Sequence, residues 1–417
     1  MLRNHPLRER VVQEMLLRRF PPVTAPAEVL QIIRIVGPAE RDGEARQAMA
    51  MPELDLSVPA MGQRHCAGVT RRGAALLWER HSEASTATVL CPGREIDGAA
   101  RRWIEALPGA VVRAIRITIA RSEADAVPIL ERACLAEEDL VTCRIGQSRF
   151  WSDFRIGADG YGRVVMAAGD TPAADLGRIV QRVQELGNYR NLALLGLPTA
   201  QEGGPELDRL EDELATLALS IAEGAHADEH LLDALSEMSA RLAHISARTA
   251  FRMSATRAYA AIVADRLASL DVRPIAGHQS LVEFNDRRLM PAVRTCANFS
   301  ERLATLDRRA ARVTALLRTR IETRIECQNR DLLASVERGI GLQIRLQHLV
   351  EGLSVLAISY YAIGLLAYLS KGVAKEIDGF SAELATAAAV VPVTLTLAIV
   401  IARRRHGLFA GDGKEGS

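Results

Sequence analysis

The sequence predicts an α+β cytoplasmic domain, followed by a long-helix domain and a C-terminal transmembrane hairpin of two helices. Three observations lead to this fold class. Aliphatic and β-branched runs alternate with helical patterns over residues 1–200. From residue 205 onward, the apolar residues recur with a helical period. Two runs of nineteen residues, 352–370 and 384–402, contain no charged residue, and each is long enough to cross a bilayer.

The composition excludes several classes of function. The 417 residues carry a net charge of +1 and only 4% aromatic residues, so neither a basic footprint nor base-stacking side chains indicate a nucleic-acid partner. The 52 basic residues include three lysines, Lys371, Lys375 and Lys414, which leaves 49 arginines. Because the first 370 residues contain no lysine, that part cannot hold a P-loop lysine, a Schiff-base lysine or a kinase-type lysine.

The cysteines and the N-terminal residues indicate a cytoplasmic body. Six cysteines are scattered without a C-x-x-C pair, at positions 66, 91, 134, 143, 296 and 327. Such a set is typical of reduced, structural thiols. The first fifteen residues are charged and lack an apolar signal-peptide core. We therefore expect the C-terminal end to bring the chain to a membrane.

Residues 1–200 are predicted to form the mixed α/β domain. The expected strands are 29–37, 74–91, 110–120 and 162–168, and the last of them follows a glycine-rich turn at 157–162. The expected helices are 5–20, 98–107, 124–135 and 174–198. The last helix should stop at Pro198, and the segment TAQEGGPE at 199–206 predicts a loop at the domain boundary.

The following domains are predicted to be helical. They are a helical domain at 205–282, a long amphipathic helix at 283–351, a transmembrane hairpin at 352–403 and a cytoplasmic tail at 404–417. In the long helix an apolar seam runs from Leu303 to Ile344 in steps that average about 3.7 residues, longer than a heptad's 3.5. This spacing predicts a straight or slightly right-handed helix that packs on neighbours, not a leucine zipper.

The two uncharged runs favour a bacterial inner-membrane location, with the lipid bilayer as a partner. Nineteen helical residues span roughly 28 Å, close to the thickness of the hydrocarbon layer. Arg403, Arg404 and Arg405 follow the second run. Positive charge favours the cytoplasmic side, so we expect both termini to be cytoplasmic. A buried helical hairpin in a soluble protein is the alternative.

One short segment carries candidate chemistry. If WERHSE alternates along a single strand, Glu79, His81 and Glu83 share one face about 6.6 Å apart in successive pairs. Two carboxylates and an imidazole could bind a divalent metal or act as acid and base. The alternative is a solvated strand face that pairs with arginines. No other cofactor is predicted.

Two further histidine patterns resemble zinc sites. The segment HADEH, His226 to His230, has the H-x-x-E-H spacing, but this spacing binds zinc only inside a helix. Here it opens a helix, and Asp228 is the expected N-cap. His65 and Cys66 could also join His81 and Cys91 in a zinc site. Both patterns are short enough to arise by chance.

Longer segments resemble a known family. GRIVQRVQELGNYRNLALLGLP, RRLMPAVRTC, LLRTRIETRIECQN and LQIRLQHLVEGLSVLAISYY together resemble the bacterial DUF3422 family of uncharacterised membrane-anchored proteins. The resemblance implies a membrane anchor and supplies no reaction. The chain departs from the family pattern at residues 14–20, where a His and a Pro are missing, and at 81–84, where the pattern has His-Thr-Glu-Phe and this chain has His-Ser-Glu-Ala. If the family's activity needs the missing His, this member lacks that activity.

Together these features favour a non-enzymatic scaffold or sensor anchored in the inner membrane. A CorA-like ion channel or transporter is one alternative. CorA-type transporters have the same order of parts as predicted here, which is a cytoplasmic α/β domain, a long helix into the first span, a short loop, a second span and a basic tail. Those proteins carry Gly-Met-Asn at the end of the first span, whereas residues 369–372 here read LSKG. A metal-dependent enzyme that uses the Glu79, His81 and Glu83 face is the other alternative. A homo-oligomer formed through the long helices and the hairpin is a further expectation.

Overall fold

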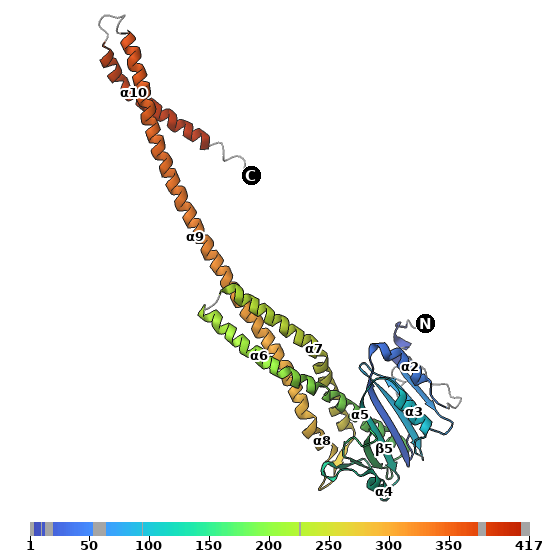
Figure 1. Ribbon diagram of the computed structural model, residues 1–417. Helices are drawn as coiled ribbons and strands as arrows, with labels where there is room; N and C mark the ends of the chain where they lie inside the picture. Colours follow the sequence, from blue (N-terminus) through green and yellow to red (C-terminus); the bar gives the residue numbers. More distant parts are fainter. Residues whose placement is uncertain are drawn as a thin grey trace. The chain divides into compact units, whose positions relative to one another are not determined.

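The computed structural model describes residues 4–9, 11–12, 20–52, 64–93, 95–224, 227–373 and 381–409. The chain divides into two compact units, Met1–Ala315 and Leu316–Ser417 (Figure 1). The first unit contains a mixed sheet with its helices, and the described elements of the second are helices. The structure therefore confirms this part of the predicted fold class, an α+β sheet domain followed by long helices.

The sheet of the first unit has nine described strands in the order β2-β3-β4-β1-β5-β8-β7-β6-β9. Only β5 and β8 pair in parallel; the other described pairs are antiparallel. The strands are β1 (Ala27–Ile35), β2 (His65–Val69), β3 (Ala75–Arg80), β4 (Ala84–Pro92), β5 (Ala110–Ala120), β6 (Val141–Ile145), β7 (Ser148–Ser152), β8 (Gly162–Ala167) and β9 (Val272–Pro274).

Some helices lie between these strands along the chain, and the others follow them. The α-helices are α2 (Arg41–Met49), α3 (Gly98–Ala106), α4 (Glu123–Ala133), α5 (Ala173–Leu194), α6 (Gly196–Glu223), α7 (Asp228–Ser269), α8 (Leu281–Arg288), α9 (Met290–Val373) and α10 (Ala382–Phe409). Two short 3-10 helices are η1 (Pro38–Glu40) and η2 (Glu137–Asp139). Half of the predicted first helix, 5–20, lies outside the described residues, and within the other half Arg8, Glu9, Val11 and Val12 are helical.

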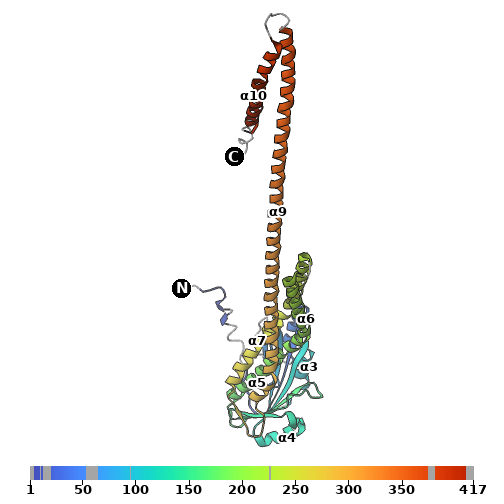
Figure 2. The ribbon, with the colours of Figure 1, turned by 90° about the vertical axis from the view of Figure 1, so that its left-hand side faces the viewer.

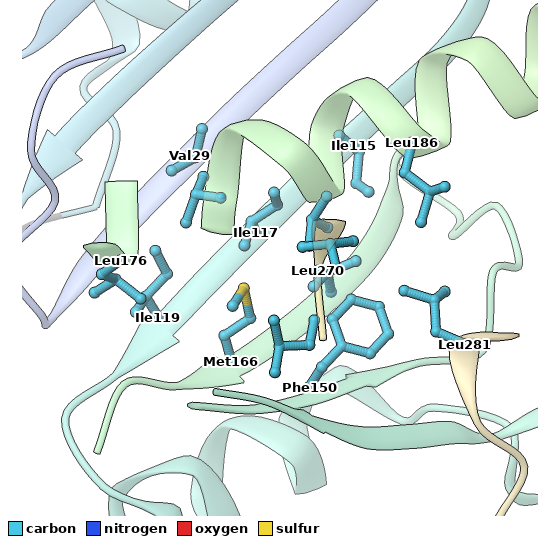
Figure 3. Packing of buried hydrophobic residues seen from close by; sticks show 14 of the residues in the cluster. Val29, Ile115, Ile117, Ile119, Phe150, Met166, Leu176, Leu186, Leu270 and Leu281 are labelled. Carbon is cyan, nitrogen blue, oxygen red and sulfur yellow. The ribbon is translucent and has the colours of Figure 1, made fainter. Parts of the chain in front are cut away.

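Both faces of the sheet carry an apolar core. On one face, Ile117 of β5 lies in a cluster with Leu186 of α5 and Val263 of α7, and Figure 3 shows the strand residues facing Leu176 and Leu186 of α5. On the other face, Trp78 of β3 packs in a second cluster with Ile104 of α3. The interior strand β1 is therefore buried on both faces, although its sequence AEVLQIIRI contains the polar residues Glu28, Gln31 and Arg34.

The predicted boundary loop at 199–206 is wrong, because these residues belong to helix α6. Pro198 lies in the first turn of α6, where a missing N–H costs no helical hydrogen bond. Gly203 lies against α9, since a Cβ at this position would come 2.8 Å from the Phe299 ring. The glycine that suggested a loop instead allows two helices to approach closely.

The N-terminal part of α9 packs on α6 within the first unit. The Arg302 guanidinium donates through Nη2 and Nε to the two Glu211 carboxylate oxygens at 2.9 and 3.2 Å, and through Nη2 to Asp208 at 2.5 Å. These carboxylates hold the pKa of Arg302 above its usual range. The seam residues Leu303, Leu306 and Ala310 are buried here. The predicted apolar seam thus begins as a packing face.

Helix α9 is one continuous helix of 84 residues (Figure 2). It includes the first uncharged run, 352–370, and α10 includes the second, 384–402. In the described part of the chain these two helices are long and apolar enough to cross a membrane. Residues 374–380, which form most of the predicted connection between the runs, lie outside the described residues.

Candidate functional site

The hairpin between β3 and β4 holds the residues for which chemistry was predicted. Strand β3 ends at Arg80 and β4 begins at Ala84. The His81 N–H donates to the Ala84 carbonyl at 2.8 Å and closes the turn. The expectation that Glu79, His81 and Glu83 share one face of a single strand is therefore wrong. A tight turn removes His81 and Glu83 from the strand pleat, on which the two-residue alternation depends.

Glu79 lies between two histidines. It is directly opposite His65 on β2 and Thr86 on β4, so the three side chains share a face of the sheet. The Glu79 carboxylate lies 3.5 Å from His65 Nδ1 and 3.8 Å from His81 Nε2. His81 Nε2 also lies 3.4 Å from Thr86 Oγ1. The structure thus groups His65 with Glu79 and His81, which the spacing along one strand could not reveal.

Glu83 makes different contacts, with helix α7. Its carboxylate accepts hydrogen bonds from the Arg252 guanidinium and, at 3.0 Å, from the Tyr259 hydroxyl. Arg252 and Tyr259 are seven residues apart, which places them on the same face of α7. Burial raises the pKa of Tyr259 to about 12, and the charge of Glu83 adds to this effect. Glu83 thus attaches the hairpin to α7, and its side chain is only 6% exposed.

The imagined zinc site of His65, Cys66, His81 and Cys91 is not formed. Adjacent strand residues point to opposite faces, so Cys66 packs with Trp78 and Cys91 in the core beneath α2 and α3, whereas His65 faces Glu79. Burial raises the pKa of the Cys66 thiol to about 12. All six cysteines are free thiols.

The H-x-x-E-H pattern is not contained in a helix as far as the structure describes it. Glu229 and His230 lie in the first turn of α7, and the N-cap is Ala227 instead of the predicted Asp228. His226 lies outside the described residues. Among the residues that the structure does describe, no group of three or more His, Cys, Asp or Glu side chains is arranged to hold a metal ion.

The buried Arg190 and the partly buried Arg113 were not singled out from the sequence. Arg113 of β5 donates to Asn188 Oδ1 of α5 at 2.9 Å, and its guanidinium occupies the space where a Gly187 side chain would lie. Arg190 of α5 lies over the Phe154 and Phe284 rings, 4.2 and 5.3 Å from their centroids. Burial lowers the pKa of both guanidinium groups, and the charge of Arg190 lowers that of Arg113 further.

A signal for Arg190 was present in the helical pattern. Arg190 follows Leu186 by four residues and precedes Ala193 by three, so it lies on the apolar face of α5. A charged residue at a core position of a helix requires a compensating contact. Here the contact is with two aromatic faces, which stabilise a cation through their ring quadrupoles.

Comparison with known proteins places the chain in a family. The model of the family described as protein of unknown function (DUF3422) matches residues 3–408. The chain belongs to this family. No curated protein and no solved structure matches the chain. The resemblance predicted from the sequence is confirmed, and the description of DUF3422 gives no reaction that could be assigned to the hairpin residues. Residues 14–19, where this DUF3422 chain departs from the pattern, lie outside the described residues.

Proposed function

We propose that this DUF3422 protein is a non-enzymatic scaffold or sensor of the bacterial inner membrane, with both termini in the cytoplasm. One observation carries the proposal. Helix α9 is continuous from residues packed on α6, such as Phe299 and Arg302, into the uncharged run at 352–370. A helix without an interruption transmits a displacement or rotation of one end to the other more directly than a flexible linker does. The same helix would therefore anchor the sheet domain and couple it to the membrane.

The contacts of the β3–β4 hairpin support the non-enzymatic part of the proposal. Glu83 is engaged by Arg252 and Tyr259 of α7, so one of the three predicted catalytic or metal-binding groups serves to attach the hairpin. Glu79 and His81 face each other at 3.8 Å. A metal-dependent enzyme remains an alternative prediction for Glu79, His81 and Glu83.

Metal content and ion flux distinguish the proposal from its two alternatives. The full-length protein is purified in detergent, analysed for metals, and reconstituted into liposomes that contain a magnesium-sensitive dye. A scaffold or sensor should contain no stoichiometric metal and should admit Mg²⁺ no faster than empty liposomes. Stoichiometric zinc, manganese or iron that is lost in His81→Ala would support the enzyme. Magnesium entry above the empty-liposome rate would support the CorA-like channel.

A further inference from the structure

An exposed apolar stripe on α9 carries the inference. Over residues 322–350 every residue of the helix is exposed. Within this segment, Ile325, Leu332, Val336, Ile340 and Ile344 are each about half exposed or more. They are spaced by four or seven residues and therefore follow one face of the helix. We call these five residues the stalk stripe.

The stalk stripe continues a seam that is buried elsewhere in the same helix. Leu303, Leu306 and Ala310 belong to the same run of apolar positions, and they are buried in the first unit. Beyond residue 321 the seam keeps its spacing but has no cover in the described structure. A contiguous exposed apolar surface of this kind marks an interaction site, and a long helix in water is stabilised mainly by packing of its apolar face.

The described helix that follows in the chain is too short to cover the stalk stripe. Helix α9 ends at Val373, and α10 contains 28 residues. An antiparallel α10 would pair with the last 28 residues of α9, which begin at residue 346 (373 − 28 + 1). The stripe ends at Ile344. The cover must therefore come from another part of the chain or from a second molecule.

We propose that the stalk stripe joins two copies of this chain in a parallel homodimer. Parallel orientation rests on the proposed membrane anchor, because two copies with spans at the same end of α9 must align in the same direction. Confinement to one membrane also raises their effective concentration. Residues 322–350 contain four arginines and four acidic residues, so the two stalks have no net charge to repel one another.

One polar residue sets the register of this dimer. Gln328 lies on the stripe between Ile325 and Leu332. In register, the two Gln328 side chains meet and can form a hydrogen bond across the dimer axis. A shifted register would place each Gln328 against an apolar side chain and leave its amide without a partner. A single polar residue in an apolar seam fixes register in this way, at some cost in stability.

Disulfide trapping in native membranes tests the dimer. The full-length background carries Cys134→Ser and Cys327→Ser, because these two thiols are exposed. Single cysteines are introduced as Leu332→Cys, Val336→Cys or Ile340→Cys. The matched control is Ala334→Cys, which is two residues from Leu332 and from Val336 and so lies on the opposite side of the helix. After mild oxidation, all three stripe variants should migrate at twice the 45.4 kDa of the monomer, and the control should not.

The outcomes separate this inference from the proposed function. Cross-linking at only one stripe position would indicate antiparallel contact and overturn the parallel dimer. Equal cross-linking of stripe and control variants, or none at any stripe position, would overturn the stripe as a self-association surface. Each sample is also fractionated, so failure of the membrane anchor is recorded separately. Adding Ile340→Glu to Leu332→Cys should abolish the cross-link and leave the membrane fraction unchanged.

Discussion

At the scale of single residues, Glu83 is the clearest example of a side chain whose role differs from its predicted one. Its buried carboxylate joins the β3–β4 turn to Arg252 and Tyr259 of α7. Glu83→Ala should lower the free energy of unfolding by about 2–4 kcal/mol, because it leaves the partly buried Arg252 without its counter-charge. Tyr259→Phe should cost about 1 kcal/mol for one hydrogen bond. Denaturant unfolding of the detergent-solubilised protein measures both effects.

His81→Ala is the matched control for Glu83→Ala in the same turn. The His81 ring is partly exposed, and its contact with the Glu79 carboxylate is 3.8 Å long. We expect its removal to cost less than about 0.5 kcal/mol, as is usual for surface substitutions. A loss for His81→Ala as large as that for Glu83→Ala would contradict this assignment of roles. Such a loss would instead support a metal site or a buried network of polar contacts around Glu79.

The thiols offer a second measurement at the residue scale. Burial raises the pKa of Cys66 to about 12 and that of Cys143 to about 11. At pH 8 these thiols are therefore protonated in the folded protein and unreactive, because the thiolate is the nucleophile. Unfolding restores an ordinary pKa near 8.5. We expect a thiol reagent to modify two cysteines in the native protein, the exposed Cys134 and Cys327, and all six in denaturant. Rapid modification of more than two native thiols would contradict the burial of the other four, Cys66, Cys91, Cys143 and Cys296.

At the scale of elements, two adjacent glycines of α6 test how that helix packs on α9. A Cβ at Gly203 would approach the Phe299 ring to 2.8 Å, whereas a Cβ at Gly204 would meet nothing within 4 Å. Gly203→Ala should therefore destabilise the protein by about 1–3 kcal/mol through overpacking. Gly204→Ala should stabilise it by about 0.5–1 kcal/mol, because alanine restricts the unfolded chain and favours the helix. Both variants are compared by denaturant midpoint, and equal effects would mean that Gly203 does not contact Phe299.

The same glycines show which elements the sequence could predict. The strand AVVRAIRITIA was predicted at 110–120, and β5 has these bounds, because its β-branched run is flanked by clear turn residues. The segment TAQEGGPE was predicted as a loop and is helix. Local propensity favoured a loop there, but contact with Phe299 requires a residue without a side chain. That contact joins positions 96 residues apart, and no local pattern contains it.

The candidate site was predictable only in part for a related reason. The segment WERHSE identified Glu79 and His81 as neighbours, and they do lie together. The sequence did not reveal that β3 stops at Arg80, because Ser82 and Glu83 do not form a typical hairpin-turn pair. It also could not place His65 opposite Glu79 or Arg252 beside Glu83, since these pairings depend on strand register and on helix docking. Arg190, in contrast, was recognisable as a charge on an apolar helix face.

At the scale of the whole molecule, the two uncharged runs should decide where the protein is found. We expect the full-length chain to sediment with inner membranes and to resist carbonate extraction, because two apolar helices are inserted far more firmly than a peripheral protein is bound. Deletion of residues 352–402 should release the protein into the soluble fraction. Full-length protein in the soluble fraction would instead mean that the two runs form a buried hairpin.

Orientation in the membrane follows from the distribution of basic residues around the two runs. Arg338 and Arg345 precede the first run, and Arg403, Arg404, Arg405 and Lys414 follow the second, whereas the connection between the runs contains only Lys371 and Lys375. Basic residues near the ends of a span favour the cytoplasm. With six on one side against two on the other, we therefore expect both termini to lie inside. A reporter that is active only in the periplasm should be silent after Ser417 and active when inserted after Glu376. The reverse pattern would overturn the topology. Replacing the three C-terminal arginines and Lys414 by asparagine leaves two basic residues on each side, so this variant should lose the strict orientation and show activity at both fusion points.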